Sequence, residues 1–187
     1  MCHYITAVLP HTVDPTAVAS LFDSYKLGFE IISNPHVVGQ IDLKAWYILT
    51  SGKHCDCGTA LGSLTRQARA QGLSYDREVE KSRKQGWSEA KIKRWLEQKE
   101  QTQERHRRVD EALAKDSGAE SQRWLAFLNA LLTRPATSKF GLLLHWYHTS
   151  VESERIRIQR RETVRLADVD AEQLMRIEED VLYEFVR

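Results

Sequence analysis

The sequence has few of the features that mark membrane or exported proteins. It has no apolar run of about 18 residues, so no membrane-spanning helix is expected. The first apolar run is interrupted by Pro10, His11 and Asp14 and no basic segment precedes it, so no secretory signal is expected. Only three cysteines occur in 187 residues, which in an unexported chain is typical of free thiols or metal ligands. Together these absences predict a cytoplasmic protein.

A strong net charge is also missing. The 27 Lys and Arg residues nearly balance the 26 Asp and Glu residues, so the overall charge does not point to nucleic acid or to a membrane surface. The chain has no dinucleotide-binding fingerprint, serine-centred elbow or paired-carboxylate motif, which weighs against an ordinary enzyme without deciding the question. At 42% hydrophobic residues, the composition is nevertheless that of a globular protein with a substantial core.

Apolar and β-branched runs near both ends of the chain predict a sheet. The predicted strands are 2–9, 29–32, 37–41, 45–50, 140–148 and 155–166. Asp14 followed by Pro15 predicts a helix start, and Asp170 begins a predicted last helix that carries Val181, Leu182 and Phe185. The expected fold class is α+β, with an antiparallel or mixed sheet built from the N- and C-terminal parts and helices packed on it.

The middle of the chain has a different character. Residues 59–134 read as a helical insertion or subdomain within a single domain of residues 1–187, whose sheet-containing body comprises 1–58 and 135–187. Ser88 is expected to cap a long charged helix over 88–114, which ends at Lys115-Asp116-Ser117-Gly118. The buried helix that follows is expected to return along it as a projecting hairpin.

The long predicted helix lacks an apolar face in its centre. The twelve residues from Glu97 to Arg108 are all polar, whereas a packed helix repeats its apolar stripe every three or four residues. We therefore expect a second copy of the chain or another protein to cover helix 88–114. Nucleic acid is the weaker alternative, because acidic residues alternate with the basic ones and favour salt bridges along the helix instead.

The chemically distinctive stretch is Gly52-Lys53-His54-Cys55-Asp56-Cys57-Gly58-Thr59. If residues 2–9 and 45–50 are neighbouring strands, Cys2 joins Cys55 and Cys57, and we expect the three sulfurs within about 8 Å of one another. With His54 they would supply the thiolate and imidazole ligands that zinc prefers, with His3 as a substitute on the opposite face of its strand. Two alternatives stay open: a redox-sensitive thiol site, and small residues in a tight turn without chemistry.

Cysteine-dependent catalysis is a further alternative. A helix starting near Thr59 would place Cys57 beside its N-terminus, where backbone N–H groups stabilise a thiolate. Removal of Met1 would leave Cys2 with both a thiol and an α-amine, the arrangement of N-terminal nucleophile hydrolases. Either cysteine would then serve a hydrolase or transferase. His145 is a spare histidine that could reach a cysteine across the sheet.

The apolar spacing also predicts the core. Its expected members are Trp124, Phe127, Leu128, Leu131, Leu144, Trp146, Leu182 and Phe185.

Overall fold

The computed structural model describes the chain except residues 1, 42–43, 53–54, 63–75 and 135–136, and for 76–78, 81, 100 and 102–117 it describes the backbone only. The strands are β1 (Cys2–Pro10), β2 (Glu30–Ile31), β3 (Ala45–Leu49), β4 (Lys139–Tyr147), β5 (Arg160–Arg165) and β6 (Val181–Val186). The helices are α1 (Pro15–Ser24), α2 (Pro35–Val38), α4 (Asp76–Lys84), α5 (Glu89–Leu132) and α6 (Ala171–Leu174), with 3-10 turns η1 (Asp56–Gly58) and η2 (Leu166–Asp168).

The six strands form one mixed sheet in the order β2-β3-β1-β4-β6-β5. All neighbours are antiparallel except β5 and β6, which are parallel and therefore need a crossover connection between them. Strand β1 pairs with β4, so the sheet joins the first 49 residues to those after residue 138. The predicted α+β class and the origin of the sheet in both ends of the chain are confirmed.

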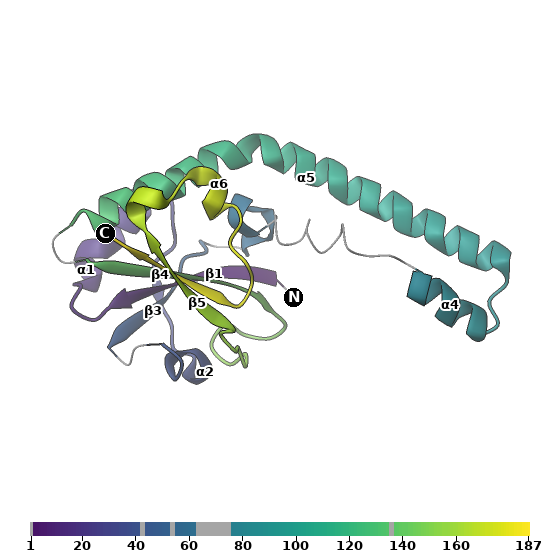
Figure 1. Cartoon of the computed structure of the whole chain (residues 1–187), viewed down its shortest axis with the longest axis horizontal. Helices are drawn as coiled ribbons and strands as arrows, with labels where there is room; N and C mark the ends of the chain where they lie inside the picture. The colour runs from purple at the N-terminus through teal and green to yellow at the C-terminus, as the bar shows by residue number, and fades with distance from the viewer. Residues whose placement is uncertain (1, 42–43, 53–54, 63–75, 135–136) are drawn as a thin grey trace.

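Side chains alternate between two buried faces of the sheet. One face, here the helix face, is covered by α1, α6 and the C-terminal part of α5, with Phe22, Phe127 and Phe140 at its centre. The other, here the α2 face, packs Tyr47, Tyr147 and Leu182 against α2 and residues 151–158 (Figure 1). Of the predicted core, only Trp146 is not fully buried: it is half-buried, with its ring against His3.

Helix α5 differs from the sequence-based expectation. It runs without interruption for 44 residues, so neither the predicted end at Lys115–Gly118 nor the returning hairpin is present. A single glycine lowers helix stability by only about 1 kcal/mol relative to alanine, and the C-terminal part of α5 is held by core packing. The N-terminal half extends beyond the sheet with α4 packed at its far end, and we call this projection the arm (Figure 1).

Three other segments also differ from the prediction. The helix that begins after Asp170 ends at Leu174, and residues 181–186 form strand β6. The predicted strand 37–41 is wrong: residues 35–38 form helix α2 and residues 39–40 a turn, because Asn34 accepts a hydrogen bond from the backbone N–H of His36 and Pro35 occupies the first helical position. Strand β5 begins at Arg160 rather than at Arg155.

Candidate metal centre

The turn that carries Cys55 and Cys57, here the cysteine turn (residues 55–59, with η1 at its centre), lies along the N-terminal half of β1. Strand β3 pairs with β1 only from Thr6 onward, so His3 and Ile5 have no strand partner on that side. The turn supplies the missing acceptors: the His3 backbone N–H donates to Cys57 Sγ at 3.1 Å, and the Ile5 N–H donates to Asp56 Oδ2 at 2.7 Å. These bonds hold the turn beside the start of the chain.

Asp56 anchors the turn from inside. Its side chain is buried, and the same Oδ2 that binds Ile5 also accepts a hydrogen bond from the Ser51 hydroxyl. Burial raises the pKa of the Asp56 carboxyl to about 6. Residues 60–62, which are helical, approach so closely that a Cβ on Gly62 would lie 2.1 Å from the Asp56 carbonyl oxygen, which requires glycine there.

The three cysteine sulfurs meet in this arrangement. The Sγ atoms of Cys2, Cys55 and Cys57 lie within 4.8 Å of one another, and each residue is half-buried. The expectation that they converge within about 8 Å is therefore confirmed. Two zinc–sulfur bonds of about 2.3 Å at a tetrahedral angle place their sulfurs roughly 3.8 Å apart, so a small contraction would bring all three to one ion.

The surroundings shift the pKa values of the Cys55 and Cys57 thiols in opposite directions. The backbone N–H of Cys57 is the main cause that lowers the pKa of the Cys55 thiol. Burial raises the pKa of Cys57 to about 11, a shift opposite in direction to the one expected for a thiolate beside a helix N-terminus. Although the Cys57 sulfur accepts the His3 N–H, this single bond does not offset the loss of water around it. Cys55 is thus the more easily ionised of the two.

The histidines behave differently from the cysteines. His54 lies outside the described residues, and His148 is exposed at the end of β4. His3 is buried on the helix face, with its Nε2 2.5 Å from Glu179 Oε1, whereas Cys2 lies on the α2 face as its alternation along β1 predicts. His145 is on the α2 face, with its Nδ1 2.5 Å from Asp180 Oδ1. Neither ring belongs to the tight group that the three sulfurs form.

Glu179 and Asp180 were not identified from the sequence. These adjacent residues send one carboxylate to each face of the sheet, where each holds a histidine. The chain turns sharply at Asp180, whose φ of 62° is unusual for a residue other than glycine, and the positions of both carboxylates depend on this turn. Among the described residues, His3 Nδ1 and His145 Nε2 are buried without a hydrogen-bond partner. The turn that contains Glu179 and Asp180 has no periodic pattern, so the sequence gives no signal for their pairing with the histidines.

Comparisons with known proteins add no further assignment. No family model, curated protein or solved structure matches this chain. None of the described helices combines the length and the apolar character needed to cross a bilayer. The sulfur cluster of Cys2, Cys55 and Cys57, a group able to hold a metal ion, is therefore the feature from which a function can be argued.

Proposed function

We propose that Cys2, Cys55 and Cys57 bind a zinc ion in a structural site. The observation that carries this proposal is the convergence of the three sulfurs within 4.8 Å from segments more than 50 residues apart. Thiolates are the ligands that zinc and other soft ions prefer, and structural zinc sites are closed by four ligands. His54, the neighbour of Cys55 in the sequence, is the candidate for the fourth position.

The ion would tie the start of the chain to the turn after β3. Because the unfolded chain has no preformed site, the free energy of metal binding adds to the stability of the folded state. The hydrogen bond from His3 to Cys57 Sγ fits this role, since an N–H directed at sulfur stabilises the thiolate that coordinates a metal. Removing the ion should loosen β1 and the turn before it affects the rest of the sheet.

Metal content tests the proposal directly. Protein purified without added metal is expected to contain about one zinc per chain, and the Cys2→Ser, Cys55→Ser and Cys57→Ser variants are each expected to lose most of it. His54→Ala tests the fourth ligand, with His148→Ala as its control because His148 is exposed at the end of β4. Wild-type protein that contains no metal, takes up none when zinc is supplied and reacts at all three thiols in the native state would contradict the proposal.

A redox-sensitive thiol pair is the second candidate, favoured by the opposite pKa shifts of Cys55 and Cys57. The Cys55 thiolate would attack glutathione disulfide and release one glutathione, and the Cys57 thiol would then displace the second. The two cysteines lose two protons and two electrons, and the glutathione disulfide gains them as two thiols.

Intact mass after incubation with glutathione disulfide separates the candidates. Loss of two hydrogen atoms in wild type but not in Cys57→Ser indicates the redox site. Resistance to oxidation that ends when a chelator removes zinc indicates the metal site.

A further inference from the structure

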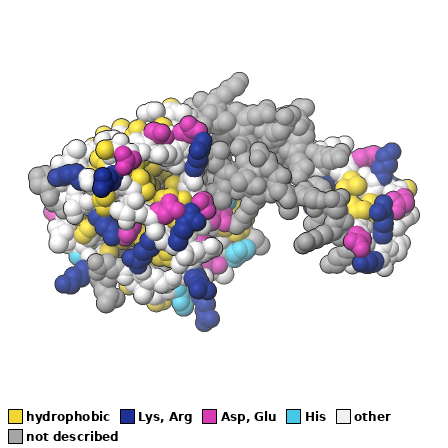
Figure 2. Space-filling model, in the orientation of Figure 1, with side chains coloured by type: hydrophobic (Ala, Val, Ile, Leu, Met, Phe, Trp, Pro, Cys, Tyr) yellow, Lys and Arg dark blue, Asp and Glu magenta, His cyan; other side chains and the backbone are white. Residues whose placement is uncertain are grey.

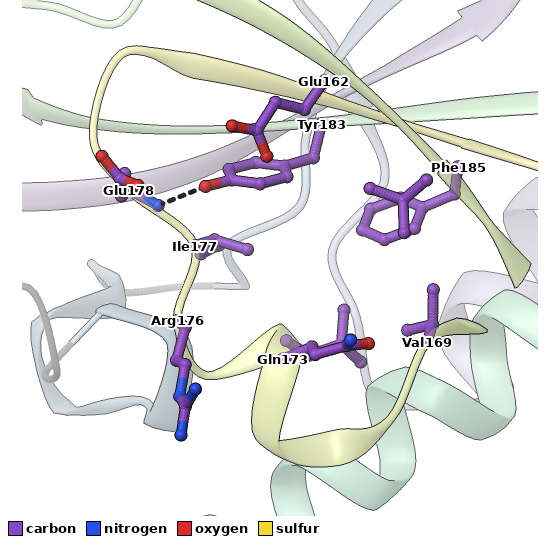
Figure 3. A pocket seen from close by; sticks show the side chains of 10 residues that line it. Glu162, Val169, Gln173, Arg176, Ile177, Glu178, Tyr183 and Phe185 are labelled. Atoms are coloured by element: carbon purple, nitrogen blue, oxygen red, sulfur yellow. Dashed lines mark hydrogen bonds between the residues drawn. The ribbon is translucent and has the colours of Figure 1, made fainter.

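A cavity of about 280 Å³ opens on the helix face beside the edge strand β5 (Figure 3). Glu162 and Val164 of β5 lie directly opposite Tyr183 and Phe185 of β6, and these four side chains form one wall. The crossover connection between the two parallel strands forms the other wall, with Val169, Gln173, Leu174, Arg176, Ile177 and Glu178. In the sheet, β4 and β6 separate β5 from β1 and its thiols, so this is a second, independent location.

The interior of the cavity is mainly apolar. Val164, Ile177 and Phe185 face it from three different segments, and Leu174 and Val169 complete the surface. Small-molecule sites have this character, with few polar groups that fix the orientation of the ligand. The volume is just below the roughly 300–1,000 Å³ of sites for drug-sized molecules, which indicates a smaller ligand with a compact apolar body.

Tyr183 supplies the polar group that orients such a ligand. Its hydroxyl oxygen accepts a hydrogen bond from the Glu178 backbone N–H at 3.1 Å, which fixes the oxygen and leaves the hydroxyl hydrogen to donate (Figure 3). Tyr183 is buried, and this burial raises its pKa, so the hydroxyl stays protonated at neutral pH. The ligand is therefore offered a hydrogen-bond donor.

The charged groups at the rim are already paired with one another. Arg160 binds both carboxylates of the wall, at 2.6 Å from Glu162 and 2.8 Å from Glu178, and Arg176 pairs with Glu172. Figure 2 likewise shows basic and acidic side chains interspersed with hydrophobic ones on the visible face of the body. A charged ligand would have to compete with these ion pairs, whereas a neutral ligand would not.

From these observations, we propose that the cavity between β5, β6 and α6 binds a small neutral molecule. Its apolar body, aryl or branched alkyl, would lie against Val164, Ile177 and Phe185. Its carbonyl oxygen would accept the hydrogen bond of the Tyr183 hydroxyl. This ligand site does not depend on the metal site and takes a different class of ligand.

Fluorine NMR with para-fluoroacetophenone, a neutral aryl ketone of suitable size, tests the proposal on the full chain. We expect saturable broadening of its signal. The acceptor-free analogue fluorobenzene should bind about three- to tenfold more weakly, since one neutral hydrogen bond is lost. The ions para-fluorobenzoate and para-fluorobenzylammonium should bind more weakly still.

Two variants test whether the probes bind in this cavity. Tyr183→Phe should weaken the ketone about three- to tenfold and leave fluorobenzene unchanged, because only the ketone uses the hydroxyl. Tyr25→Phe, at a partly buried tyrosine elsewhere in the helix-face core, is the matched control. Val164→Phe should abolish binding of both probes by filling the cavity, and Thr163→Phe adds the same ring at the exposed neighbouring position of β5.

Four results would overturn the proposal. One is the absence of saturable binding of the ketone to wild-type protein. Another is unchanged ketone affinity in Tyr183→Phe, and the third is unchanged affinity in a Val164→Phe variant that melts at the wild-type temperature. A charged probe that binds more tightly than the ketone would likewise show that the site is ionic and not of the proposed class.

Discussion

Phe127 and Trp146 show how burial sets the contribution of single aromatic residues. Phe127 is fully buried, with the rings of Phe22 and Phe140 at centroid distances of 4.6 and 5.6 Å. Trp146 is half-buried and contacts the ring of His3 from one side. Both residues were expected in the core because of their spacing, but spacing along a strand does not show how well its end is covered.

Alanine substitutions should separate the two positions. Phe127→Ala should lower the free energy of unfolding by about 3–5 kcal/mol, because it leaves a cavity among packed rings. Trp146→Ala should cost about half as much, since water already reaches part of the indole. Urea denaturation of both variants measures the difference. Equal losses would mean that Trp146 is as well packed as Phe127.

The same contrast applies to the candidate metal centre. The approach of Cys2 to Cys55 and Cys57 could be predicted because it depends on two neighbouring strands, and strands have a clear sequence pattern. The acidity of the thiols could not, because it depends on which backbone N–H groups and how much protein surround each sulfur. The hydrogen-bonded pairs His3–Glu179 and His145–Asp180 likewise depend on the left-handed backbone conformation of Asp180, which has no sequence signature.

Among the elements, α5 provides the clearest test, because Gly118 was expected to end a helix and instead lies within one. A Cβ on Gly118 would meet nothing within 4 Å, and its φ is not in the left-handed region. Gly118→Ala should therefore raise the free energy of unfolding by about 0.5–1 kcal/mol, because alanine loses less backbone entropy in a helix.

Thermal unfolding measures this effect, with Gly62→Ala as the contrasting variant. Gly62→Ala should be strongly destabilising, because the added methyl group would collide with the Asp56 carbonyl oxygen. A Gly118→Ala variant that is less stable than wild type would indicate a break in the helix at that residue.

The wrongly assigned elements share a physical cause. Apart from Glu184, residues 181–186 carry apolar or aromatic side chains on both faces because β6 is buried on both sides, and such a pattern resembles a buried helix in a short segment. For residues 35–38, the β-branched Val37 and Val38 favoured the prediction of a strand, although Asn34 and Pro35 form a capping signal for the helix that the structure contains. Tertiary packing decided the first case and local capping the second.

For the whole molecule, the arm is the surface on which we expect a partner to bind. Its helix extends beyond the sheet, and a polar helix without packing is only marginally stable in water. At the far end Ile92 is buried, and Lys91 lies 3.9 Å from the centre of the Trp87 ring, so this end has local packing of its own. The middle of the arm is where we expect a second copy of the chain to bind.

Charge reversal in the middle of the arm tests this expectation. We expect wild-type protein to sediment as a dimer, and the Arg105→Glu, Arg107→Glu and Arg108→Glu triple variant to sediment as a monomer with an unchanged circular dichroism spectrum. Reversing Arg83, Lys84 and Lys93 near the tip is the control for total charge and should leave the dimer intact. A wild-type monomer at high concentration would remove the arm as a self-association surface, and salt-sensitive binding to RNA or DNA would identify nucleic acid instead.

The cysteine turn beside β1 protects a strand edge from aggregation. On the outer edge of residues 2–5, the hydrogen bonds supplied by the described part of the chain come from Asp56, Cys57 and Thr50. If the turn detaches, through oxidation of its cysteines or loss of an ion, an apolar strand edge next to the N-terminus becomes available to other chains. Aggregation of the damaged protein would then begin by strand addition at this edge while the rest of the sheet is still folded.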